Sequence, residues 1–94
     1  MRKILEELAN EEKMLERHNV FSAIQGSISC VQQDLQPPRK SKAEYDIAKG
    51  EIGHAYILVG AVEHLENITL KHTRTILAHY AKQIGYQPKV QKSE

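Results

Sequence analysis

The chain has 94 residues, with 13 Lys and Arg, 12 Asp and Glu and a formal net charge of +1. That length allows one small domain. A composition of 40% hydrophobic and 27% charged residues is typical of a folded chain rather than a disordered one. The aromatic residues are four Tyr and one Phe, which disfavours a nucleic-acid platform that stacks bases on aromatic side chains.

Cysteine content and hydropathy bear on the compartment. Cys30 is the only cysteine, so the chain can form no internal disulfide and no thiolate metal cluster. The first residues, MRKILEELANEE, are charged from the start and lack a signal-peptide core. The apolar run 52–62 is too short to span a membrane and contains His54. These features predict a cytoplasmic protein without a membrane partner.

The first third of the chain predicts helix in two registers. Apolar residues up to Leu15 follow one stripe, and those from Phe21 to Leu35 follow another at steps of three and four. RHN at 17–19 separates the two stripes. Either one long helix bends there, or Asn19 ends a short helix and caps the next. We favour a break.

The segment LQPPRKSK, residues 35–42, contains two prolines that interrupt any helix. Ser41 then begins SKAE, which has the capping-box pattern with Glu44 at the third helical position. A new helix is therefore predicted to start after Ser41.

The predicted helix over residues 42–66 is the most apolar element. Its main stripe runs from Tyr45 to Val62, and additional residues such as Ile57 and Leu65 widen the stripe over most of the circumference. A helix of this kind is usually central and buried.

A last helix is predicted after the tight connection ENIT at 66–69, with Thr69 as its N-cap. Gly85 is predicted to end this helix as a C-cap before Pro88. We expect an all-α protein of three to four helices in a bundle, forming a single helical domain over 1–86 with a flexible tail at 87–94. The apolar stripes are wider than a small monomer needs, so we also expect homodimerisation to complete the core.

Glycines inside the helices predict close packing. Each costs about 1 kcal/mol relative to alanine, which favours a specific reason for its presence. Gly26 shares one face of its helix with Ser22 and Cys30, and Gly53 and Gly60 lie seven residues apart on the next helix. We expect helix backbones to approach closely at these glycines.

Glu51 and His54 form an E-x-x-H pair, the spacing with which carboxylate-bridged metal proteins grip one ion from one helix. The chain has a single such pair, whereas a full site needs a second pair and further carboxylates. We therefore predict no metal and no cofactor, with Glu51 and His54 as the alternative ligands.

The fragment GEIGHAYILVGAVEHLENITL, residues 50–70, resembles the C-terminal half of MazG-type nucleotide pyrophosphohydrolases. Those proteins have an E-L-G-D start, an apolar helix and a short turn into the last helix. The resemblance implies a magnesium-binding role for Glu51. His54 stands where the family has an aspartate, and histidine is a poor ligand for magnesium. A degenerate hydrolase of this type is one alternative function.

Arg74 and His79 in RTILAHY resemble the R-x4-H element of HEPN-type ribonucleases, whose paired arginine and histidine act on RNA across a dimer interface. The resemblance implies that His79 is the general acid–base and that Arg74 stabilises the phosphate. On a regular helix the two side chains point about 140° apart. A ribonuclease of this type is the other enzymatic alternative.

The C-terminal third is basic, with five Lys and Arg against Glu94 alone in residues 68–94. Such an excess predicts an acidic partner. We predict a non-enzymatic interaction or regulatory protein, similar to accessory factors of phage or mobile elements, that binds a protein partner or, alternatively, nucleic acid. The predicted binding surface lies on the last helix and consists of Lys71, His72, Arg74, His79 and Lys82.

Overall fold

The computed structural model describes residues 2–86, and this part of the chain contains four α-helices and no strand. The predicted all-α class is confirmed, and of the two alternatives at residues 17–19 the structure has two separate helices. The predicted tail, 87–94, lies outside the described residues. The helices are α1 (Arg2–Arg17), α2 (Phe21–Asp34), α3 (Lys42–Glu66) and α4 (Lys71–Ile84).

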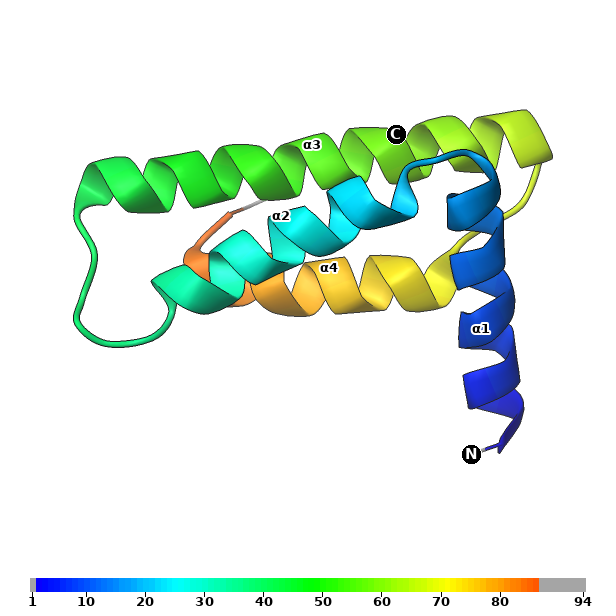
Figure 1. Cartoon of the computed structure of the whole chain (residues 1–94), viewed down its shortest axis with the longest axis horizontal. Helices are drawn as coiled ribbons and strands as arrows, with labels where there is room; N and C mark the ends of the chain where they lie inside the picture. Colours follow the sequence, from blue (N-terminus) through cyan, green and yellow to red (C-terminus); the bar gives the residue numbers. More distant parts are fainter. Residues whose placement is uncertain (1, 87–94) are drawn as a thin grey trace, which may run out of the picture.

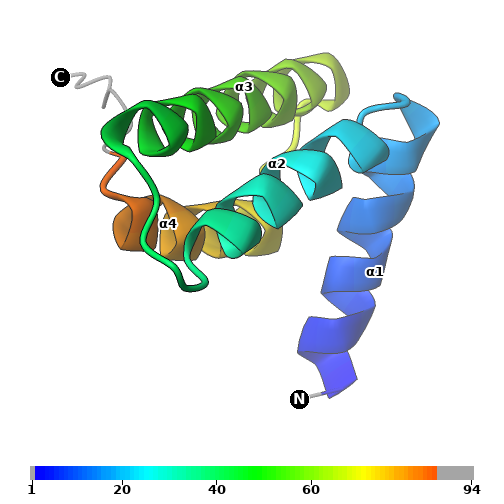
Figure 2. The same ribbon diagram turned by 60° about the vertical axis from the view of Figure 1, so that its left-hand side comes forward.

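Helices α2, α3 and α4 pack along one another as a bundle, and α1 runs across the end of the bundle (Figures 1 and 2). The crossing lies where α2 begins, α3 ends and α4 begins (Figure 1). The described chain measures 38 × 33 × 25 Å along its principal axes. None of its helices is long and apolar enough to cross a membrane.

The core forms around α3. Five α3 residues from Ala48 to Val62 are at most 2% exposed, and they follow the apolar stripe that the sequence predicts. Helix α2 adds Ile24 and Val31, and α1 adds Leu15. The remaining buried apolar residues come from α4 and its start, namely Leu70, Leu77, Ala81 and Ile84.

Three helices end in a left-handed residue. Asn19, Asn67 and Gly85 have φ values of 61°, 57° and 86°, and the following amide donates to a carbonyl five residues back in each case. This geometry satisfies carbonyls that have no partner inside the helix. Gly85 is thus confirmed as a C-cap. Asn19 ends α1 but does not cap α2, whose N-cap position is Val20 without a side-chain bond.

Ser41 begins α3 as predicted. Its hydroxyl accepts a hydrogen bond from the Glu44 amide at 3.2 Å, and the Glu44 carboxylate accepts one from the Ser41 amide at 2.9 Å. This reciprocal pair is the capping box expected from SKAE.

The predicted close backbone approach at the glycines is not found. A Cβ placed on Gly26 would have no atom within 4 Å, because this side of α2 is exposed. At Gly53 the nearest atom is the Tyr86 hydroxyl at 3.1 Å, and at Gly60 it is the Arg74 guanidinium at 3.9 Å. Gly53 and Gly60 therefore make room for side chains.

Candidate functional site

Glu11 of α1 caps the first turn of α4. One carboxylate oxygen accepts hydrogen bonds from the amide and the hydroxyl of Thr73, both at 2.7 Å, and the other accepts one from the His72 amide at 3.1 Å. Glu11 is only 9% exposed. A carboxylate is favourable at this position because the first amides of a helix lack partners and carry partial positive charge. The predicted cap Thr69 is therefore wrong, and Leu70 occupies the N-cap position.

Glu63 of α3 binds the same end of α4. It accepts two hydrogen bonds from the Arg74 guanidinium, at 2.6 and 2.8 Å, and one from the Leu70 amide at 2.8 Å. The bond from Arg74 lowers the pKa of Glu63, and the same bond raises the pKa of Arg74. Arg74, which the sequence places in the binding surface and in the alternative catalytic pair, is thus bound to α3.

Lys71 and His72 also face a carboxylate. Glu7 Oε1 lies 2.7 Å from His72 Nε2 and 3.9 Å from Lys71 Nζ. The hydrogen bond from His72 lowers the pKa of Glu7. The excess of positive charge in residues 68–94 is partly neutralised at residues 71–74, because Glu7 of α1 and Glu63 of α3 pair with side chains there.

His79 and Lys82 complete the predicted binding surface, and both are exposed. His79 Nε2 lies 3.2 Å from the Gln83 side-chain nitrogen, and its ring meets Tyr80 edge-on at 5.0 Å between centroids. Arg74 instead binds Glu63. No hydrogen bond within residues 2–86 joins Arg74 and His79. The two side chains of the ribonuclease-like pair therefore contact different residues.

Glu51 and His54 are both exposed on α3. Glu51 accepts a hydrogen bond from the Ser27 hydroxyl of α2 at 3.2 Å. Across residues 2–86 no group of three or more His, Cys, Asp or Glu side chains is arranged to hold a metal ion. Within residues 2–86, therefore, no third side chain joins Glu51 and His54 as a metal ligand.

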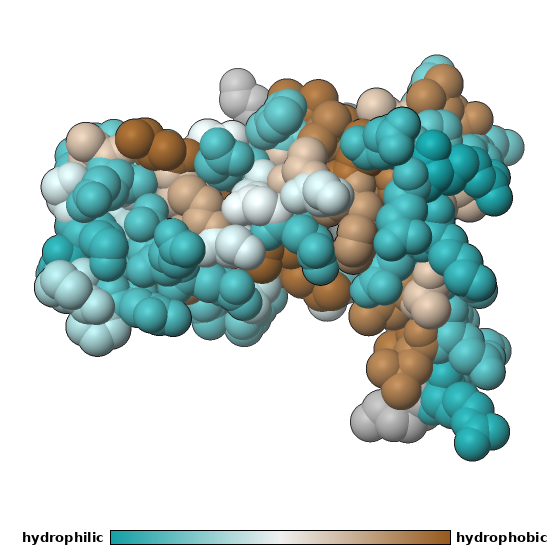
Figure 3. Space-filling model, in the orientation of Figure 1, coloured by the Kyte–Doolittle hydropathy of each residue, from teal (hydrophilic) through white to brown (hydrophobic). Residues whose placement is uncertain are grey.

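One side of α3 is exposed, contrary to the expectation that the helix is buried around most of its circumference. Ile57 and Leu65 are each 69% exposed and Ile47 is 63% exposed. Figure 3 shows hydrophobic surface along the upper edge of the molecule, where α3 runs. The residues of this side, called the outer stripe of α3 below, are Ile47, Gly50, His54, Ile57, Ala61 and Leu65.

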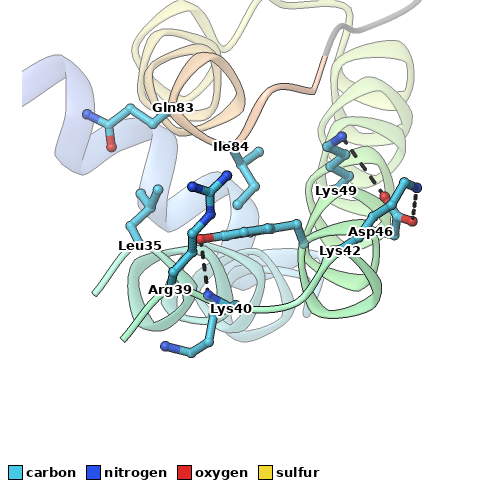
Figure 4. Close-up of a pocket in the computed structure, with 9 residues that line it drawn as sticks. Leu35, Arg39, Lys40, Lys42, Asp46, Lys49, Gln83 and Ile84 are labelled. Atoms are coloured by element: carbon cyan, nitrogen blue, oxygen red, sulfur yellow. Dashed lines mark hydrogen bonds and ion pairs between the residues drawn. The ribbon is translucent and has the colours of Figure 1, made fainter. Parts of the chain in front are cut away.

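A pocket of 620 Å³ lies at the other end of the bundle from α1, among the α2–α3 loop, the start of α3 and the end of α4 (Figure 4). Its lining includes the cations Arg39, Lys40, Lys42 and Lys49. Sequence reasoning missed this site. The run RKSK at 39–42 is the available signal, but only the fold brings it beside Lys49 and the last turn of α4.

Comparisons of the chain with protein-family models, curated proteins and solved structures yield no match.

Proposed function

We propose that the protein is a homodimeric interaction module that acts by binding another macromolecule, and that the outer stripe of α3 joins the two copies. The observation that carries this proposal is the exposure of Ile57 and Leu65, at 69% each, on the side of α3 opposite the core. Large apolar side chains aligned on one helix face are typical of a contact with another helix.

The outer stripe differs from a solvated helix face. Solvated faces carry mainly charged and polar residues, whereas residues 52–62 contain no Asp, Glu, Lys or Arg. From Ile47 to Leu65 the stripe extends about 27 Å, at about 1.5 Å per residue. Its members recur at steps of three and four, so they form one continuous ridge.

A second copy of the chain fits this ridge. Two copies bring no like charges together along it, and the stripe has two small residues, Gly50 and Ala61, among larger ones. In an antiparallel pair centred between Ile57 and Leu58, Gly50 of one copy faces Leu65 of the other, and His54 faces Ala61. Small residues opposite large ones let two helices approach closely, and a two-fold axis repeats each contact.

The size of the contact indicates that α2 takes part as well. A stable interface buries roughly 800 Å² on each partner, which is more than one helix ridge offers. Helix α2 packs directly on α3, and residues 19–33 contain no Asp, Glu, Lys or Arg. Ser22 and Gly26 are exposed there and small, so they extend the uncharged surface without blocking a neighbour.

This dimer leaves α4 free. Helix α4 lies across the core from the outer stripe (Figure 1). Its exposed Lys82 and His79 remain available to an acidic protein partner, with nucleic acid as the alternative. Lys71, His72 and Arg74 contribute less to such a surface, because Glu7 and Glu63 already pair with them.

Sedimentation equilibrium at micromolar concentration tests the proposal. We expect a dimer for the parent protein and a helical monomer for Ile57→Glu and Leu65→Glu. The matched control is Leu5→Glu, because Leu5 is 62% exposed on α1 and receives the same change. A monomeric parent protein contradicts the proposal. If only Leu5→Glu abolishes the dimer, the interface lies on α1 and not on the outer stripe of α3.

Partner binding is tested on the folded dimer. Lys82→Glu is expected to weaken capture of an acidic host protein, whereas Lys13→Glu on α1 is not. Incubation with RNA, and with nucleoside triphosphates and magnesium, checks the enzymatic alternatives. Turnover of RNA that is lost in His79→Ala would show that the protein is a ribonuclease. Turnover of nucleotides that is lost in Glu51→Ala would show that it is a nucleotide hydrolase.

A further inference from the structure

We propose that the pocket between the α2–α3 loop and the end of α4 binds a small phosphorylated molecule, which goes beyond the proposed function. The pocket has a volume of 620 Å³. Sites for small molecules usually have volumes of about 300–1,000 Å³. The pocket therefore has room for a phosphate group together with an organic part of modest size.

The charges around the pocket favour an anion. Four cations, Arg39, Lys40, Lys42 and Lys49, line it with one carboxylate, Asp46, so the excess is three positive charges (four minus one). Asp46 Oδ2 lies 2.9 Å from Lys42 Nζ, and Asp46 Oδ1 lies 4.0 Å from Lys49 Nζ. The hydrogen bond from Lys42 lowers the pKa of Asp46, which keeps this carboxylate ionised. The ionised carboxylate leaves most of the positive charge uncompensated.

The cations of the loop have different roles. Lys40 Nζ donates to the carbonyls of Gln36 and Pro38, both at 3.0 Å, so this ammonium holds the loop together. No carboxylate among residues 2–86 pairs with Arg39, whose guanidinium reaches into the pocket in Figure 4. A planar guanidinium binds phosphate through two parallel hydrogen bonds. Arg39 is therefore the residue that would fix the phosphate.

The start of α3 already carries an acidic group. The amides of a first helical turn carry partial positive charge, which favours anions nearby. Glu44 is the acidic group at this helix end, and its carboxylate is bound within the capping box by the Ser41 amide. Because this carboxylate already offsets the partial charge of the helix start, attraction of the ligand phosphate depends on the cations of the pocket.

The rest of the lining favours an organic group on the ligand. Leu35 and Ile84 contribute apolar surface, and Tyr45 also belongs to the lining. The Tyr45 hydroxyl accepts a hydrogen bond from the Lys40 amide at 3.3 Å, which fixes the ring relative to the loop. A ligand with a ring or short alkyl part would use this surface, whereas inorganic phosphate would not.

Chemical-shift titrations of the full chain with phenyl phosphate and inorganic phosphate test the proposal. We expect phenyl phosphate to bind several-fold more tightly and to shift the amides of residues 39–49 and 83–84. Arg39→Glu should weaken binding roughly tenfold or more, because a charge-assisted contact is lost. Lys13→Glu, which makes the same charge change at an exposed site on α1, should leave binding unchanged.

Other outcomes overturn the proposal. Shifts absent up to about 10 mM ligand show that there is no site. Equal loss of binding in Arg39→Glu and Lys13→Glu shows attraction by net charge alone. Tighter binding of a DNA duplex, with a steep dependence on salt, assigns the pocket to nucleic acid. The Ile57→Glu variant should bind phenyl phosphate as the parent does, so dimerisation and ligand binding are tested separately.

Discussion

Glu11 in α1 lies 2.7 Å from the backbone nitrogen of Thr73 in α4, across a separation of 62 residues in the chain. This single contact explains two features of the fold. It fixes α1 across the end of the bundle, and it supplies the cap that the sequence around Thr69 does not provide. A carboxylate that is 9% exposed is tolerated there because both of its oxygens accept hydrogen bonds.

Replacing Glu11 should destabilise the protein. Glu11→Ala leaves the first amides of α4 buried without partners, which costs about 1–3 kcal/mol. Glu11→Gln should cost less, because the amide keeps one accepting oxygen. Urea unfolding followed by circular dichroism measures both variants. Glu6→Ala, an exposed change one turn earlier in α1, is the control and should be nearly neutral. A loss in Glu6→Ala equal to that in Glu11→Ala would contradict the capping role.

The pair of Glu63 and Arg74 predicts acid sensitivity. Arg74 lowers the pKa of Glu63 below its usual 4.5, so the folded state binds that proton more weakly than the unfolded chain. The stabilisation is therefore fully present above pH 4.5 and is lost as the pH falls through the lower, folded-state pKa. At neutral pH, Glu63→Gln should cost about 1 kcal/mol, a modest value because the pair is partly exposed.

Unfolding by urea at a series of pH values checks this prediction. The difference between the parent protein and Glu63→Gln should shrink as the pH falls below 4.5. A difference that stays constant down to the acid limit of folding would show that the carboxylate charge contributes nothing. Glu6→Gln is a useful control, since Glu6 lies exposed on α1 and the change removes the same charge at a site without Arg74.

These contacts show which parts of the fold the sequence predicts. The capping box at Ser41 and the C-cap at Gly85 were predictable, because both depend on residues close in the chain. The start of α4 was not, since its caps come from Glu11 and Glu63. The local sequence pattern around a helix start does not indicate a carboxylate that another helix contributes.

The two sides of α3 show a second limit. Periodicity identifies Ile52 and Val59 as core residues, and both are fully buried. It identifies Ile57 and Leu65 as apolar too, yet both are mostly exposed. Hydropathy does not decide which of two apolar faces packs inside the chain and which stays exposed. For the same reason the sequence suggested association without locating the surface.

Gly26 and Gly53 should respond differently to alanine. Around Gly26 the space is open, so Gly26→Ala should stabilise α2 by about 0.5–1 kcal/mol through helix propensity. At Gly53 the new methyl group would lie 3.1 Å from the Tyr86 hydroxyl, so the ring must shift and the gain is offset. Thermal unfolding, under conditions in which sedimentation shows every variant to be monomeric, measures both changes without a contribution from association. Equal gains at the two sites would contradict the contact with Tyr86.

Cys30 should react slowly with iodoacetamide. Burial raises the pKa of its thiol, and the nearby carboxylates of Asp34 and Glu51 raise it further, so little of the reactive thiolate is present at pH 8. As the chain has a single cysteine, mass spectrometry follows this one site without interference. The rate should rise in urea, where burial is removed, and more modestly in Glu51→Gln, where one negative charge is lost. A folded-state rate equal to the rate in urea would show that neither burial nor charge protects the thiol.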